Sequence, residues 1–141
     1  MIKIIDTHHH LWDMSKFSYP WLTNQVDTFL GNYNKICKDY LLKDFLEDAK
    51  SINLNKSIHI QAELDHEIDP VKETIWLQSI SNNNKNNRKL PNGIVGYANF
   101  YSNNIDDILK RHKKNDNFRG IRQMLNFAND KKLCLIESDN V

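Results

Sequence analysis

The chain has 141 residues, of which 40% are hydrophobic and 26% are charged, a balance typical of a globular protein rather than a disordered or fibrous one. Its 19 basic and 18 acidic residues give a formal net charge of +1, so no excess of charge favours nucleic acid or an anionic membrane surface as a partner. No stretch approaches the ~20 apolar residues that span a bilayer, and the first residues lack the long apolar region of a signal peptide. We therefore expect a cytoplasmic protein with no membrane partner.

Four short apolar stretches are predicted to be strands, and three segments between them have the apolar spacing of helices. The predicted strands are residues 2–6, 57–62, 93–100 and 120–124. The predicted helices are residues 41–49, 71–80 and 105–109, where apolar residues recur three and four positions apart. Asp69 and Pro70 are typical of a helix start, because proline is tolerated in the first turn. The basic run 110–114 is predicted to be the solvated end of the third helix, where cations suit the helix dipole.

The order of these elements is strand, long loop, helix, strand, helix, strand, helix, strand. Such alternation predicts an α/β fold with parallel strands joined by right-handed crossovers. A closed (β/α)8 TIM barrel takes about 250 residues, so residues 1–141 are expected to form the N-terminal portion of one, with about four βα units. A half-barrel exposes strand edges and an apolar inner face. We therefore expect self-association, or a partner chain that supplies the missing half.

Three consecutive histidines follow the first predicted strand directly. Alternation along a strand sends His8 and His10 to one face and His9 to the other. Two imidazoles on one face can ligate a divalent cation, and nitrogen ligands suit zinc and its neighbours. A bound cation would lower the pKa of a water and supply hydroxide near neutral pH. An accidental cluster or an expression tag is the alternative, although a tag would be longer and would not continue a strand.

Six stretches of the chain carry a more specific signal. They are IDTHHHLWD (5–13), FSYPWL (17–22), HIQAE (59–63), DPVKETIWL (69–77), GIVGYA (93–98) and FRGIRQM (118–124). In sequence and in order, these stretches resemble the amidohydrolase-related family of TIM-barrel hydrolases, which includes sugar-lactone and dicarboxylate-lactone hydrolases. The resemblance covers nearly the whole chain and agrees with the barrel that the alternating elements predict.

The resemblance implies that His8 and His10 are first-strand metal ligands, or substrate-contacting histidines in those family members that work without a metal. Zinc is the most fitting cation for such a pair. The family's further histidines and its acid-base aspartate come from later strands, which we expect this chain to lack. His59 in a strand, His66 in a loop and His112 at a helix end do not match those positions. The chain alone is therefore expected to be catalytically inactive.

Four further residues are candidates for substrate binding. Gln61 and Glu63 close the second predicted strand on one face and are expected to line the pocket, with a plain loop carboxylate as the alternative for Glu63. Arg122 ends the fourth predicted strand, where its guanidinium suits a carboxylate or lactone oxygen, or else forms a structural ion pair. Tyr19, in an aromatic first loop, either faces substrate or packs in the barrel mouth. Gln123 departs from the family, which often has a histidine there, and cannot titrate.

Together the resemblance implies a hydrolase that opens a lactone of a sugar or dicarboxylate type with activated water. Hydrolysis of a cyclic amide, or a decarboxylation, is the nearest alternative chemistry. For the chain as given, three interpretations remain open: an inactive fragment of an enzyme, one subunit of a split enzyme, or a half-barrel that serves as a binding or structural module.

Overall fold

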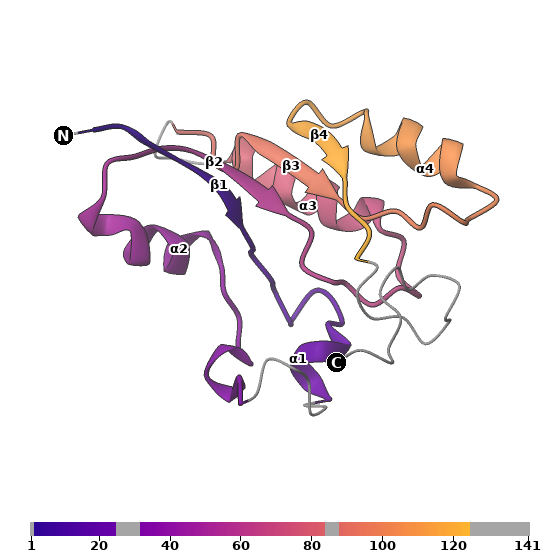
Figure 1. The fold of residues 1–141 in the computed structure, drawn as a ribbon, viewed down its shortest axis with the longest axis horizontal. Helices are drawn as coiled ribbons and strands as arrows, with labels where there is room; N and C mark the ends of the chain where they lie inside the picture. Colours follow the sequence, from indigo (N-terminus) through magenta and orange to yellow (C-terminus); the bar gives the residue numbers. More distant parts are fainter. Residues whose placement is uncertain (1, 25–31, 84–87, 125–141) are drawn as a thin grey trace, which may run out of the picture.

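The computed structural model describes residues 2–24, 32–83 and 88–124 and shows a two-layer α/β arrangement. Four strands, β1 (Ile4–His9), β2 (Leu54–Ile60), β3 (Gly93–Gly96) and β4 (Phe118–Ile121), lie side by side in the order β1-β2-β3-β4 (Figure 1). Every neighbouring pair of these strands is parallel. The predicted class, α/β with parallel strands, is therefore confirmed. The described sheet is open, so the closed barrel stays a prediction.

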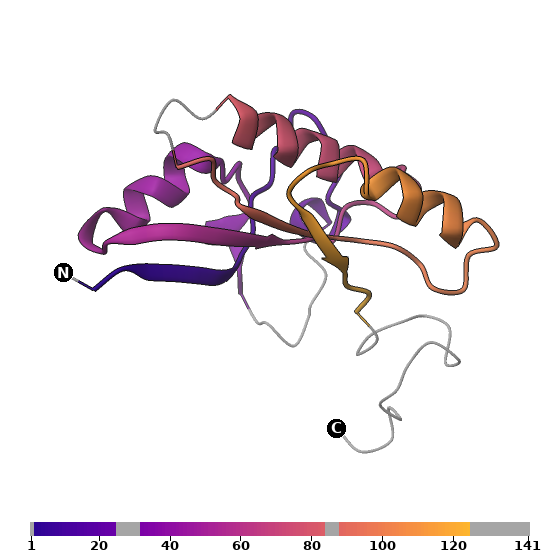
Figure 2. The same cartoon turned by 90° about the horizontal axis from the view of Figure 1, so that it is seen from above.

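Helices α2 (Leu42–Asp48), α3 (Val71–Asn82) and α4 (Ile105–His112) all cover the same face of the sheet (Figure 2). The short α1 (Pro20–Thr23) lies beyond the carboxyl end of β1 (Figure 1), and two single turns of 3-10 helix, Asn34–Ile36 and Ala49–Ser51, flank α2 in the chain. Among the described residues, no helix combines the length and the apolar character that a membrane crossing requires.

The strand boundaries differ from the predicted ones in two informative places. The first strand runs on through the histidines to His9, because it pairs with β2 as far as the His9 and His59 partners. The third strand ends at Gly96 instead of residue 100. The chain turns there, and the side chain of Asn99 accepts the backbone N–H of Tyr101 at 2.9 Å, a local bond that competes with the sheet ladder.

The main hydrophobic core lies between the sheet and the helices. Its buried members are Leu11, Phe45, Leu54, Leu77, Leu90 and Ile94. Each such side chain contributes about 1.5–3 kcal/mol by leaving water, so this layer supplies most of the stability of the described fold. In the edge strand β1, Ile5 is 54% exposed. The described apolar core thus lies on the side of the sheet that the helices cover (Figure 2).

His112 lies in this structural layer, contrary to the solvated position that the basic run predicted. It is fully buried, and its ring stacks on Phe118 at 4.9 Å. Its Nδ1 pairs with the hydroxyl of Thr74 at 2.9 Å and its Nε2 with the carbonyl of Tyr97 at 3.0 Å. The prediction was wrong because the imidazole has two polar atoms that α3 and β3 satisfy inside the protein.

Gly96 is expected to tolerate no side chain, because His112 and Thr74 approach its backbone closely. A Cβ at Gly96 would lie 2.8 Å from the ring carbon Cε1 of His112 and 2.9 Å from the hydroxyl of Thr74. We expect Gly96→Ala to lower the free energy of unfolding by about 1–3 kcal/mol, the usual cost of overpacking. Gly120→Ala is the matched control, since a Cβ there meets nothing within 4 Å. Urea denaturation of both variants tests this; equal stabilities would contradict the expected clash.

Candidate functional site at the carboxyl end of the sheet

His8 and His10 face one another at the carboxyl end of β1, as strand alternation predicts. Their Nε2 atoms are 3.2 Å apart, and their rings meet edge to face with centroids 5.0 Å apart. The Nδ1 of His10 lies 2.8 Å from the carbonyl oxygen of Ile60, and only a protonated Nδ1 can donate to that acceptor. Neutral His10 therefore has an unprotonated Nε2, which accepts from the Nε2 of His8 in this structure and is the tautomer that a metal ligand needs.

The spacing of this histidine pair fits a shared cation. Two nitrogen ligands at about 2.0–2.1 Å from a tetrahedral zinc lie roughly 3.3 Å apart, close to the observed 3.2 Å. Burial lowers the pKa of His10, so the ring stays neutral and able to ligate near pH 7. No cluster of three or more metal-ligating side chains occurs within the described part of the chain. The described residues thus offer two ligands of a four-ligand site.

His9 points to the helix side, as predicted. Its ring stacks on Phe45 with centroids 4.1 Å apart, and its Nε2 pairs with the buried hydroxyl of Ser57 at 3.0 Å. Burial lowers the pKa of His9 to about 4. The neighbouring His59 is fully buried with its Nε2 at 3.2 Å from the carbonyl of Leu11, and burial lowers its pKa as well. The rings of His9 and His59 are therefore neutral near pH 7 and pack in the protein interior next to the His8–His10 pair.

Gln61 and Glu63 meet in a turn rather than along a strand. β2 ends at Ile60, and Glu63 has a φ of 55°, a left-handed conformation that non-glycine residues rarely adopt. The Gln61 side chain accepts the backbone N–H of Glu63 at 2.7 Å and donates its amide N–H to the Glu63 carboxylate. Gln61 and Glu63 therefore lie together, as expected. A strained turn brings them together, rather than alternation along a strand.

The turn also brings His66 onto Glu63. The Nε2 of His66 lies 3.5 Å from Oε2 of Glu63, and the His66 ring stacks on the ring of Tyr97 at 4.4 Å with the planes 6° apart. Burial alone would raise the pKa of Glu63, but the bonds from His66 and Gln61 and the charge of Arg122 outweigh it, so the pKa is lowered. Glu63 is therefore a stable carboxylate among cations.

Arg122 follows β4 directly and continues its ladder, because its N–H donates to the carbonyl of Gly96 at 2.9 Å. Its positive charge acts on both Glu63 and His10, which places it at the same end of the sheet. Its Nη1 is buried and has no hydrogen-bond partner among the described residues. A buried guanidinium nitrogen without a partner is costly, and a bound anion would satisfy it.

No family model matches the chain, whereas a curated sequence and a solved structure are similar to it. The chain is 45% identical over 130 residues, 92% of its length, to the uncharacterized protein y4mH of Sinorhizobium fredii. It spans 42% of the length of that relative. A solved structure titled Amidohydrolase 2, from Bifidobacterium longum subsp. infantis, has 22% identity and a TM-score of 0.49 over 70% of this chain and 34% of its own.

Tyr19 lies apart from these polar groups. Its side chain is fully buried in a second apolar cluster with Trp12, Leu22, Ala62 and Leu64, and its hydroxyl has no partner among the described residues. Burial raises its pKa above the usual value, and the nearby carboxyl of Glu73 adds to that rise. Of the two roles that the sequence left open, packing in the first loop matches this burial, and contact with substrate stays a prediction.

Glu73 is a buried carboxyl that the sequence analysis missed. It is 1% exposed, it lies on α3, and its Oε1 accepts the backbone N–H of Ala62 at 3.1 Å. Burial is the main cause that raises its pKa to about 8, so it is largely protonated at pH 7. It holds the chain immediately before the left-handed Glu63. In the sequence it had looked like an ordinary helix glutamate.

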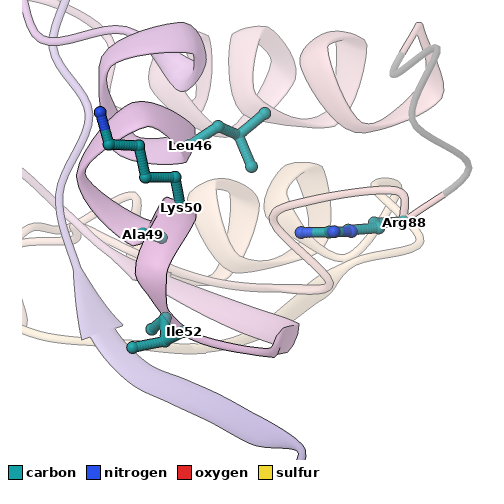
Figure 3. A pocket seen from close by; sticks show the side chains of 5 residues that line it. All are labelled: Leu46, Ala49, Lys50, Ile52 and Arg88. Atoms are coloured by element: carbon teal, nitrogen blue, oxygen red, sulfur yellow. The ribbon is translucent and has the colours of Figure 1, made fainter.

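A hollow of about 490 Å³ lies at the opposite end of the sheet and is lined by Leu46, Ala49, Lys50, Ile52 and Arg88 (Figure 3). Ile52 precedes β2 and Arg88 precedes β3, so the hollow is at the amino ends of the strands. Its Lys50 pairs with Glu47. Active sites of parallel α/β folds form at the carboxyl ends of the strands, so the position of this hollow does not favour it as the active site.

Proposed function

We propose that this chain carries part of the active site of a hydrolase of the amidohydrolase-related type, which opens a lactone of a sugar or a dicarboxylate. The observation that carries the proposal is the His8–His10 pair, with Nε2 atoms 3.2 Å apart at the carboxyl end of a parallel sheet. The motif resemblance supports the same reaction class. Because the relative is more than twice as long as the matched region, the activity proposed is that of a whole protein.

The proposed roles follow from the chemistry of each side chain. His8 and His10 would hold a divalent cation, zinc by ligand type, which when bound supplies a hydroxide-forming water near neutral pH. The carbonyl of Ile60 fixes the ring of His10 through Nδ1. Arg122 binds the substrate's carboxylate or acyl oxygen through Nη1, which no described residue hydrogen-bonds.

The proposal is tested by a substrate screen on a chimera in which residues 1–124 of this chain replace their counterparts in y4mH. Such a chimera contains the residues described above together with the rest of the longer relative. Sugar lactones, dicarboxylate lactones and cyclic amides are compared, with decarboxylation followed as released carbon dioxide. Hydrolysis of lactones is the expected result. Activity on amides alone, or carbon dioxide release without hydrolysis, would reject the lactone proposal, and a chimera with no activity would leave a binding module as the better account.

A further inference from the structure

His66 has the surroundings of a proton-transfer residue, although its place in a loop gave no indication of one. Its Nε2 faces the Glu63 carboxylate at 3.5 Å, and one face of its ring is covered by Tyr97 at 4.4 Å. No described residue hydrogen-bonds to its Nδ1, and 57% of its side chain remains exposed. A carboxylate on one ring nitrogen and an open second nitrogen is the arrangement in which an oriented imidazole exchanges protons.

Glu63, the partner of His66, is held in place by more contacts than an ordinary surface ion pair has. Glu63 is held in a left-handed conformation, and Gln61, fully buried, bonds both its backbone and its carboxylate. One step further back, buried Glu73 holds the backbone of Ala62. Non-glycine residues with positive φ cost about 1–3 kcal/mol and persist where the surroundings impose them, often at functional sites. Here the left-handed conformation of Glu63 places its carboxylate against the ring of His66.

The charges around the pair favour an imidazolium near neutral pH. Glu63 is the first cause that raises the pKa of His66, by its hydrogen bond and its charge, and Asp65 in the same loop adds to it while partial burial opposes it. Tyr97, which follows β3 directly, covers the ring and is uncharged near neutral pH, and burial raises its pKa further. Arg122, after β4, acts on Glu63 and keeps it ionised. Such an imidazolium can give a proton and take one back.

We propose that His66 is the proton donor for ring opening in the hydrolysis proposed above, with Glu63 as the residue that positions it. The inference rests on that proposed function. As the oxygen of water bonds to the acyl carbon and the ring C–O bond breaks, the departing oxygen keeps the electron pair and takes the proton from Nδ1 of His66. The neutral imidazole then recovers a proton that the attacking water has lost, so the step balances without a further reactant.

The pairing is tested on the 141-residue chain by nitrogen NMR of the His66 ring across pH. The unmodified chain is expected to titrate with a pKa above the ordinary 6.5, and Glu63→Gln is expected to lower that pKa while Glu63→Asp restores part of it. Glu67→Gln is the matched control, because it removes an exposed negative charge from the residue next to His66. An identical His66 pKa in the unmodified chain and in Glu63→Gln would overturn the pairing.

The proton transfer is tested in the chimera with two lactones that differ in the oxygen that departs. An aliphatic lactone releases an alkoxide that needs a proton, whereas a phenolic lactone releases a phenolate that does not. His66→Gln should lower kcat about 100-fold or more for the aliphatic lactone and less than about tenfold for the phenolic one. Equal losses, or no loss, would overturn the donor role while the proposed hydrolysis stands. If the unmodified chimera hydrolyses neither lactone, the proposed function fails and the donor role with it.

Discussion

Glu73→Gln is expected to make the chain more stable than the unmodified protein at alkaline pH. The unmodified protein should lose stability as pH rises from mildly acidic values, and the variant should not show this loss. Glu73 is 1% exposed, and burial raises its pKa from 4.5 to about 8. Between these two values the folded state keeps the proton and the unfolded state gives it up. The unfolded state then binds fewer protons than the folded state, so the free energy of unfolding falls as pH rises. The contribution of protonated Glu73 is lost above about pH 8.

The size of the effect makes it measurable. At about 1.36 kcal/mol per pH unit, the full loss over this window is on the order of 5 kcal/mol, a large share of the 5–15 kcal/mol that holds an ordinary domain together. Glutamine stays neutral, and its carbonyl oxygen can accept the N–H of Ala62 as the glutamate does. The variant should therefore match the natural chain near pH 4 and exceed it increasingly towards pH 9.

Urea denaturation at pH 4 to 9 measures this difference, with Glu67→Gln as the exposed control. His9 adds a separate effect: its pKa is lowered from 6.5 to about 4, so stability falls as pH drops through that window. Because both proteins contain His9, it cancels in the comparison. Parallel stability profiles for the natural chain and Glu73→Gln would show that Glu73 is ionised at neutral pH in the folded protein.

His8→Ala and His10→Ala are each expected to abolish the zinc binding that isothermal titration detects in the chain. The two Nε2 atoms lie 3.2 Å apart and make up the pair, so either change leaves a single imidazole. The affinity for zinc should fall by more than about tenfold. Changing a residue that only hydrogen-bonds to a metal ligand already lowers metal affinity roughly 10–100-fold. Binding in the natural chain should itself be weak, because the described residues supply only two ligands.

His66→Gln is the control for this experiment, because it removes an exposed histidine that lies outside the pair. Changing His9 should also matter less for zinc, since its ring packs against Phe45 on the helix side. Zinc affinity that survives the loss of both His8 and His10 would place the cation elsewhere and remove the observation on which the proposed function rests. Protein unfolding, followed by circular dichroism, separates a lost ligand from a lost fold.

Regular alternation let the sequence predict the sheet, its helices and the shared face of His8 and His10. Each of these features depends on a period of about two or 3.6 residues that can be seen in the chain itself. His66 and Glu63 were harder, because their contact depends on one left-handed residue, and nothing in an Ala62-Glu63-Leu64 sequence marks a positive φ. His112 was placed in solvent for a similar reason: its neighbours in sequence are basic, whereas its partners come from α3 and β3.

Arg122 and Tyr19 show a different limit of sequence reasoning. The end of a predicted strand correctly placed Arg122 near the carboxyl edge, because strand ends of a parallel sheet share one edge. Tyr19 is buried by residues distant in the sequence, Ala62 and Leu64, so its complete burial could not be read from composition. Both residues keep their predicted substrate roles as hypotheses, and the argument is stronger for Arg122, whose buried Nη1 has no hydrogen-bond partner in the part of the chain that the structure describes.

The strand order β1-β2-β3-β4 has a consequence for the order in which this protein is made. Each strand pairs with the one synthesised just before it, so each new strand can dock on the sheet already made while the ribosome is still extending the chain. The histidine pair leaves the ribosome first and Arg122 last among the site residues. We therefore expect the candidate site at the carboxyl end of the sheet to be assembled in sequence, with Arg122 arriving only after β1, β2 and β3 have formed.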